Sequence, residues 1–267
     1  MHTERLEKHR AIMAVDLLIS VAAIIGALIA FFGIRGLRDI RRVALRIRAA
    51  RDKADEELRT LPAVDITSEI SPDLKTTLAE LGRRLDMLEE LGQPLEAGDL
   101  IARGNAWYSQ GDYMRAASWY ERAIAAKPGL ADGHYRRGIA LYQLGQYEDA
   151  LASLARVIEL SPDDAEAAYV KGLVLRQLGR YEDAVSSYSR AITLSPGWPR
   201  PYLGRAAVHA LLGRTQESLA DLASLVEVDR GSRDAIESSP DFEGLRDNPE
   251  YRRLVGTPAV TRLTEDN

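Results

Sequence analysis

Residues 145–164 read GQYEDALASLARVIELSPDD, and residues 179–198 read GRYEDAVSSYSRAITLSPGW. A less regular copy, GDYMRAASWYERAIAAKPGL, precedes them at residues 111–130. The copies start 34 residues apart; each begins with glycine, has tyrosine two places later and carries a proline near its end. A period of this length with small residues at fixed places is typical of stacked helical hairpins. The pattern therefore predicts an all-α solenoid.

The repeats resemble the tetratricopeptide repeat family when four units are aligned as residues 97–130, 131–164, 165–198 and 199–232. The family pattern has a small residue at the eighth place of a unit, alanine at the twentieth and a large apolar residue at the twenty-fourth. These places hold Gly104, Gly138, Gly172 and Ala206; Ala116, Ala150, Ala184 and Ser218; and Tyr120, Leu154, Tyr188 and Leu222. The resemblance implies a right-handed superhelical solenoid of helical hairpins whose fourth unit is degenerate.

Simple packing physics agrees with that pattern. Small side chains at the eighth and twentieth places let the two helices of a hairpin approach, and the large side chains fill the remaining gap. The glycine between the helices can take the left-handed conformation that ends a helix. Those glycines are Gly111, Gly145, Gly179 and Gly213.

Length and composition limit the class of protein. The chain has 267 residues, of which 46% are hydrophobic and 28% charged, so most of it can fold. The net charge of −5 argues against general nucleic-acid binding. The absence of cysteine excludes disulfides, thiol catalysis and thiolate metal sites.

An apolar stretch near the N-terminus predicts a membrane helix at residues 11–34, after a short flank at residues 1–10. Residues 17–34 read LLISVAAIIGALIAFFGI and carry no charge. Eighteen residues in a helix span roughly 27 Å, close to the ~30 Å hydrocarbon core of a bilayer. A buried core helix or a cleavable signal peptide are the alternatives, but arginines follow the stretch in place of a cleavage site. We expect Asp16 to lie at the headgroup level.

The next segment, residues 35–60, is predicted to be a basic helix at the membrane surface. Because the flank richer in Lys and Arg tends to stay cytoplasmic, we expect a single-pass protein of the cell (inner) membrane, with its N-terminus outside and its repeats in the cytoplasm. The residues expected to face the anionic leaflet are Arg35, Arg38, Arg41, Arg42, Arg46 and Arg48. Apolar residues spaced three and four apart give this helix a short coiled-coil seam, so it is either a lone stalk or the contact of a homodimer. The seam residues are Ile40, Val43, Ile47, Ala50 and Ala54.

The remaining segments flank the repeats. Residues 61–71 have the composition of a linker, and residues 72–92 predict a helix that covers the first repeat with a leucine stripe. Residues 233–256 predict short capping helices after the last repeat, and residues 257–267 predict a disordered tail.

The resemblance also implies a binding surface. In the family, the second, fifth, ninth and twelfth places of each first helix face a concave groove, and tyrosine and arginine are common anchors for a bound peptide. The residues expected there are Ile101, Asn105, Tyr108, Tyr135, Ile139, Tyr142, Glu166, Tyr169, Leu173, Arg176, Arg200 and Leu203. The carboxylate clamp of chaperone-binding relatives is not expected, because only Asn105 matches it and Glu166 would repel a carboxylate.

Nothing in the sequence predicts chemistry. The four histidines show no metal-ligand spacing, and we find no glycine-rich phosphate loop, nucleophile elbow or paired acids. We therefore expect no catalytic residue, no metal, no cofactor and no nucleic-acid partner. The sequence favours a membrane-anchored scaffold that recruits a protein or peptide through the groove. The alternative is a structural subunit or assembly factor of a bacterial envelope or secretion complex.

Overall fold

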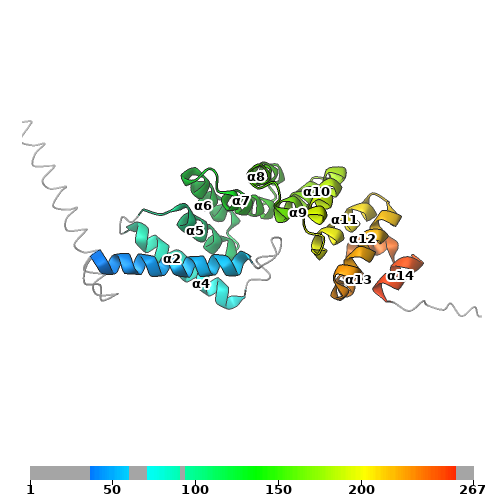
Figure 1. Ribbon diagram of the computed structural model, residues 1–267, viewed down its shortest axis with the longest axis horizontal. Helices are drawn as coiled ribbons and strands as arrows, with labels where there is room; N and C mark the ends of the chain where they lie inside the picture. The colour runs from blue at the N-terminus through cyan, green and yellow to red at the C-terminus, as the bar shows by residue number, and fades with distance from the viewer. Residues whose placement is uncertain (1–36, 60–70, 91–93, 257–267) are drawn as a thin grey trace, which may run out of the picture.

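The computed structural model describes residues 37–59, 71–90 and 94–256, and all regular structure in those ranges is helical. Figure 1 shows the helices as a row of antiparallel pairs, with two further helices at one end and short helices at the other. The helices are α2 (Leu37–Arg59), α4 (Pro72–Glu90), α5 (Ala97–Ser109), α6 (Tyr113–Ala126), α7 (Ala131–Gln143), α8 (Tyr147–Leu160), α9 (Ala165–Gln177), α10 (Tyr181–Leu194), α11 (Pro199–Leu211), α12 (Thr215–Val228), η1 (Arg230–Ser232), α13 (Arg233–Ser238), η2 (Pro240–Leu245) and α14 (Pro249–Val255).

Four hairpins form the body of this all-α solenoid: α5 with α6, α7 with α8, α9 with α10, and α11 with α12. Each second helix also packs on the first helix of the next hairpin. The glycines between paired helices take the predicted left-handed conformation, with φ between +71° and +81°. These residues are Gly111, Gly145, Gly179 and Gly213.

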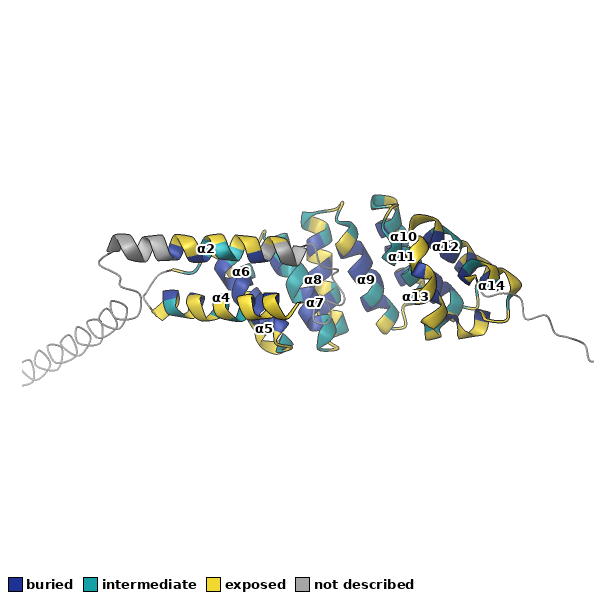
Figure 2. Ribbon diagram, turned by 90° about the horizontal axis from the view of Figure 1, so that it is seen from below, coloured by how far each residue is buried: buried dark blue, intermediate teal, exposed yellow. Residues whose placement is uncertain are grey.

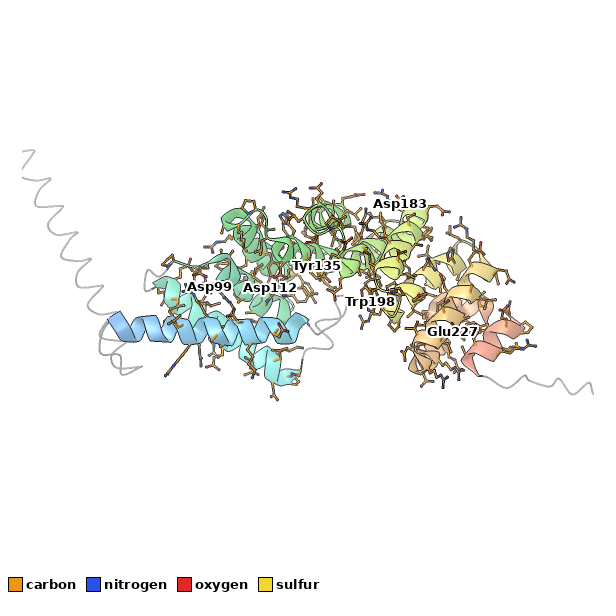
Figure 3. All side chains as sticks on the ribbon, in the orientation of Figure 1. Asp99, Asp112, Tyr135, Asp183, Trp198 and Glu227 are labelled. Carbon is orange, nitrogen blue, oxygen red and sulfur yellow. The ribbon has the colours of Figure 1, made fainter. Side chains whose placement is uncertain are left out.

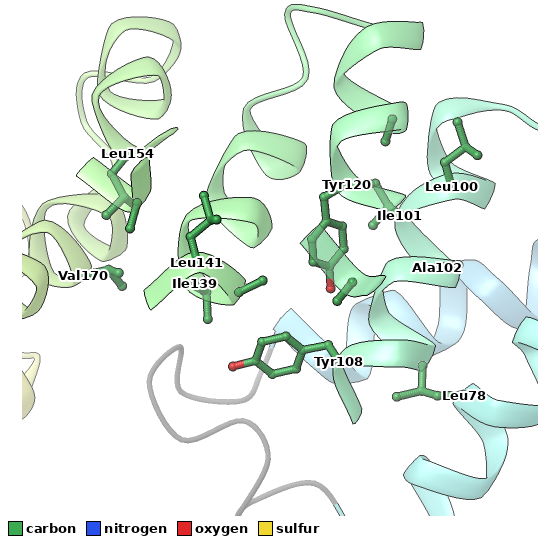
Figure 4. Packing of buried hydrophobic residues seen from close by; sticks show 14 of the residues in the cluster. Leu78, Leu100, Ile101, Ala102, Tyr108, Tyr120, Ile139, Leu141, Leu154 and Val170 are labelled. Carbon is green, nitrogen blue, oxygen red and sulfur yellow. The ribbon is translucent and has the colours of Figure 1, made fainter. Parts of the chain in front are cut away.

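Close helix packing at small residues confirms the physical interpretation of the repeat. Ala116, Ala150 and Ala184 are fully buried. Tyr120 and Tyr188 lie directly against Gly104 and Gly172, where an added Cβ would come within 2.3 Å and 2.6 Å of the tyrosine rings. Figure 4 shows Tyr120 in the core between neighbouring helices. Larger residues at these glycines would therefore force the hairpins apart.

The N-terminal end of the row is covered by α4 and α2. The five leucines of α4 are buried, and α4 packs on α5 at Gly82, where an added Cβ would lie 3.1 Å from Ala106. Helix α2 packs on both α4 and α5 and lies alongside α4 in Figure 2. Thus α2 is not a lone stalk.

The apolar seam of α2 is used inside the chain. Ala44, Ile47 and Ala54 are buried at 7%, 4% and 3% exposure. The predicted dimer seam includes Ile47 and Ala54, which this intramolecular packing now occupies. Nothing in the described residues indicates a homodimer through residues 35–60.

The C-terminal end has its own core. Ile236 and Phe242 are fully buried and Tyr251 nearly so, together with side chains of α11 and α12. The Tyr251 hydroxyl donates to the Ile236 carbonyl over 3.1 Å. This segment closes the last hairpin much as α4 closes the first.

The predicted membrane helix, residues 11–34, lies outside the described residues, as do Arg35 and the tail at residues 257–267. Within the ranges that the structure does describe, no helix combines the length and the apolar character needed to cross a bilayer.

Candidate protein-binding surface

The twelve residues predicted for the groove lie on α5, α7, α9 and α11, the first helices of the four hairpins. Helix α9 contacts both α7 and α11, so these three first helices form one continuous layer. We call the surface defined by these twelve residues the inner face.

Five inner-face residues are buried, so this conformation does not offer them to a partner. They are Ile101, Asn105, Tyr108, Ile139 and Tyr169, with exposures of 2% to 7%. Three of them, Ile101, Tyr108 and Ile139, appear among the packed side chains of Figure 4.

Asn105 shows what such a buried residue does. Its Oδ1 accepts hydrogen bonds from the Tyr120 hydroxyl at 2.9 Å and from Arg136 Nη1 at 3.1 Å. The amide therefore satisfies polar groups between the first two hairpins. Asn105, the one match to the carboxylate clamp, is thus engaged in internal structure.

The centre of the inner face is more accessible. Tyr135 and Tyr142 on α7 and Leu173 on α9 are half-buried, and Glu166 at the start of α9 is exposed. Figure 3 shows Tyr135 on α7 near the middle of the row. The Tyr142 hydroxyl accepts from Gln177 Nε2 at 3.4 Å. We call these four residues the central patch.

The central patch contains an imperfectly satisfied polar group. The Tyr135 hydroxyl oxygen is buried and forms no hydrogen bond of regular geometry in the part of the chain that the structure describes. Burial, followed by the charges of Glu166 and Asp164, raises the pKa of Tyr135 well above its ordinary value. Burial and then the neighbouring Asp164 charge raise the pKa of Glu166. The Tyr135 hydroxyl and the Glu166 carboxylate thus perturb one another within the central patch.

The C-terminal segment reaches the inner face at Arg176. Its Nη2 lies 2.5 Å from Asp241 Oδ1 of η2, and both side chains are about three-quarters covered. Close by, Tyr169 packs edge-on against Trp198 with ring centroids 4.8 Å apart. Arg176, a predicted anchor for a partner, thus also forms an ion pair within the chain. Sequence reasoning missed Asp241 because it lies after the repeats, so the repeat pattern does not relate it to Arg176.

The fourth hairpin supplies the last two predicted residues. Arg200 and Leu203 on α11 are half-buried. They extend the inner face beyond α9 towards the C-terminal core.

The basic residues of α2 lie in a different place from the inner face. Arg46 is exposed, whereas Arg48 and Arg51 meet the buried carboxylate of Asp99 at the start of α5, at 3.7 Å and 2.8 Å. Arg48 also lies 3.3 Å from Glu96. Arg48, which the sequence predicts to face the membrane surface, therefore also pairs with an internal acid. Arg38, Arg41 and Arg42 belong to α2, and their side chains lie outside the described residues.

The titratable side chains of the described residues bear on whether the chain could hold a metal ion. In residues 37–59, 71–90 and 94–256, no group of three His, Cys, Asp or Glu residues is placed to hold a metal ion. His209 lies beside Asp221 at 3.9 Å, but the adjoining Arg205 occupies that carboxylate.

The geometry described above, paired helices stacked around small residues, defines a helical-repeat solenoid. Two family models match the chain: one described as "Tetratricopeptide repeat" over residues 135–199, and one described as "TPR repeat" over residues 104–145. The chain is a tetratricopeptide-repeat protein.

Solved structures of tetratricopeptide-repeat proteins share this fold. The structure described as "MamA 41-end from Desulfovibrio magneticus RS-1" is 21% identical, with a TM-score of 0.56, and the match covers 69% of this chain and 95% of that one. YrrB, described as "a TPR protein with an unusual peptide-binding site", is 23% identical with a TM-score of 0.54, covering 70% and 96%. A further MamA crystal structure is 21% identical with a TM-score of 0.55, covering 58% and 91%. A search of curated proteins gave no match.

Proposed function

We propose that the chain is a membrane-anchored scaffold that recruits a protein partner through the central patch of its inner face. The fold is that of a protein-interaction module. The observation that carries the proposal is the central patch itself, where two tyrosines, a leucine and a glutamate lie accessible on adjacent first helices. Half-buried tyrosines on a rigid layer bind with little loss of conformational entropy.

Glu166 supports a polar contact in that interaction, because it is exposed at the start of α9 within the central patch. The peptide-binding site for which the YrrB structure is described is consistent with this use of the fold.

Differential capture tests the binding surface. The full chain, extracted in detergent, would be compared with a Tyr142→Ala/Leu173→Ala double variant and with a Met114→Ala control, whose side chain is 71% exposed on α6. We expect proteins retained by the wild type and the control to be depleted at least about tenfold by the double variant. Equal retention by all three would contradict the central patch, provided that circular dichroism shows the double variant folded.

Membrane anchoring is the second part of the proposal, and the uncharged stretch at residues 17–34 supports it. The excess of arginine after that stretch supports a cytoplasmic position for the repeats. A reporter fused after Asn267 tests the orientation, because alkaline phosphatase is active only outside the cytoplasm. Phosphatase activity of that fusion would contradict the proposed topology.

A further inference from the structure

A cation occupies the seventh place of every aligned repeat unit, on the first helix of each hairpin. In sequence these residues are Arg103, Arg137, Lys171 and Arg205, each 34 residues after the last. Among the described residues, the three arginines bind side chains of their own chain, whereas Lys171 does not.

The three arginines are held by side chains that the structure describes. Arg103 pairs with Asp86 and with Glu89 of α4, and its guanidinium lies over the Trp119 ring, 4.4 Å from the centroid. Arg137 Nη1 donates to Ser153 Oγ at 2.7 Å.

Arg205 has the most complete set of partners. It donates to both carboxylate oxygens of Asp221, at 2.9 Å and 2.6 Å, and to Ser189 Oγ at 2.8 Å. Asp221 lies 16 residues after Arg205, as Ser153 lies 16 residues after Arg137. In these two hairpins the second helix thus supplies the partner.

Lys171 is different. The residue 16 places later is Ser187, whose hydroxyl donates to the Asp183 carbonyl at 2.9 Å. Among the described residues, Lys171 forms no hydrogen bond or ion pair. Lys171, a half-buried residue, therefore lacks the counter-group that the fourth hairpin supplies to Arg205 through Asp221.

A pocket of about 430 Å³ opens beside this lysine, between α8, α9 and α10. Its apolar lining comes from Ile158, Ala168 and Leu175, and its polar lining includes Ser186 and Ser187. The charged groups that line it are Lys171, Arg180, Asp183 and Arg190.

Two of the three cations in the pocket have no carboxylate partner within the described chain. Arg180 is neutralised by Asp183 at 2.8 Å. Within the described ranges, Arg190 donates only to the Pro162 carbonyl, at 2.6 Å. At the corresponding place of the second unit, Arg156 meets Glu159 at 2.6 Å. The pocket therefore holds two positive charges, Lys171 and Arg190, that no acid of its own hairpin balances.

The pocket is separate from the inner face. Lys171 lies two residues from both Tyr169 and Leu173, which is roughly 200° around an α-helix. Figure 3 places Asp183 along the upper edge of α10, whereas Tyr135 and Trp198 lie lower in the same view. A partner bound at the central patch would leave this pocket open.

We propose that this pocket binds a carboxylate side chain from an acidic segment of a protein partner. Lys171 and Arg190 supply the charge, and the apolar lining accommodates the methylene groups of a glutamate. A carboxylate suits the site because Asp221 supplies one to the matching cation of the fourth hairpin. The inference rests on the proposed function only in that the occupant belongs to a protein partner.

The test uses the full chain in detergent and a fluorescent hexaglutamate peptide as the probe. We expect Lys171→Gln and Arg190→Gln each to weaken peptide binding by at least about tenfold, since each variant loses a charged hydrogen bond to the bound carboxylate. Lys127→Gln is the matched control, because Lys127 is exposed outside the pocket, and it should leave binding unchanged.

A second variant, Ser187→Asp, copies the arrangement of Asp221. It should supply the missing carboxylate from within, abolish peptide binding and leave the helical signal in circular dichroism unchanged. Lys171→Arg should retain binding. Together, the two variants distinguish loss of the binding site from loss of the fold.

Several results would overturn the proposal. They are an absence of peptide binding by the wild type, equal loss in Lys127→Gln, or unchanged binding in Lys171→Gln. If a phosphoserine peptide binds in a Lys171-dependent manner and hexaglutamate does not bind, the ligand of the pocket is a phosphate and not a carboxylate. The central-patch variants test a different surface. The proposed function and the pocket proposal can therefore be contradicted independently of one another.

Discussion

At the scale of single residues, the tyrosine ring opposite Gly104 or Gly172 sets how closely the paired helices approach. An added Cβ at Gly104 would lie 2.3 Å from the ring of Tyr120, and the Tyr120 hydroxyl is held at 2.9 Å by Asn105. The ring cannot swing away without losing this hydrogen bond. Gly104 is therefore required by space, although glycine usually weakens a helix.

We predict that Gly104→Ala lowers the free energy of unfolding by about 1–3 kcal/mol through overpacking. Gly129→Ala is the control, because an added Cβ there meets nothing within 4 Å. The control should change stability by less than about 1 kcal/mol. Urea titrations followed by circular dichroism would measure both, and equal stability of the two variants would contradict this account of the hairpin.

His209 makes stability depend on pH. Burial, chiefly, lowers the pKa of His209 below its ordinary value near 6.5; the charges of Arg205 and Arg214 act in the same direction, and those of Asp221 and Glu217 oppose them. The unfolded chain therefore takes up a proton at this residue before the folded chain does. The contribution of neutral His209 is complete above about pH 6.5 and is lost as the pH falls towards its depressed folded pKa.

We predict that His209→Gln, which cannot be protonated, loses less stability than the wild type between pH 7.5 and pH 5.5. The difference between the two proteins isolates His209 from the carboxylates that titrate in both. The free energy of unfolding at the two pH values is the measurement. A larger pH-dependent loss in the variant would show that the sign is wrong.

At the scale of elements, one buried acid connects helices that are distant in the sequence. Asp99 has no exposed side-chain surface and accepts from Arg51 Nη1 at 2.8 Å, across 48 residues of chain. It also accepts from the Glu96 backbone amide at 2.9 Å, so it caps α5 while it holds α2. The docking of α2 therefore depends on the charge of Asp99.

We predict that Asp99→Asn loosens α2 and speeds amide hydrogen exchange in residues 44–54 by about tenfold or more. Asp112→Asn is the control, because Asp112 caps α6 through the Arg115 amide and is not tied to α2. The control should leave exchange in residues 44–54 unchanged. Equal exchange in both variants would show that α2 is held by its apolar seam alone.

At the scale of the whole molecule, the sequence predicts the row of hairpins, the leucine-striped covering helix and the C-terminal capping helices, but not the docking of α2 or the side-chain pairs that hold the ends. The repeat glycines and alanines act on their immediate neighbours, so their period specifies the helix pairs and their close contacts. The pairs Arg51–Asp99 and Arg176–Asp241 join residues that lie 48 and 65 positions apart in the sequence. Neither separation follows the 34-residue period of the repeats. No pattern in a single sequence marks such partners.

The same reasoning explains why only some residues of the predicted groove are accessible. Family places identify which residues of a first helix lie on the inner face, but the neighbouring helices decide how far each is covered. Tyr108 and Tyr169 are buried at 4% and 7% exposure, whereas Tyr135 and Tyr142 at equivalent places of the second hairpin are half-buried. Only the assembled stack distinguishes the central patch from its buried neighbours.

Site-specific photo-crosslinking in cells tests the central claim that the inner face binds a protein. The full chain would carry benzoylphenylalanine in place of Tyr142, or in place of Met114 on α6 as a control. The account predicts a discrete protein adduct from position 142 that is absent from position 114. An adduct from position 114 alone, or identical adducts from both positions, would contradict it.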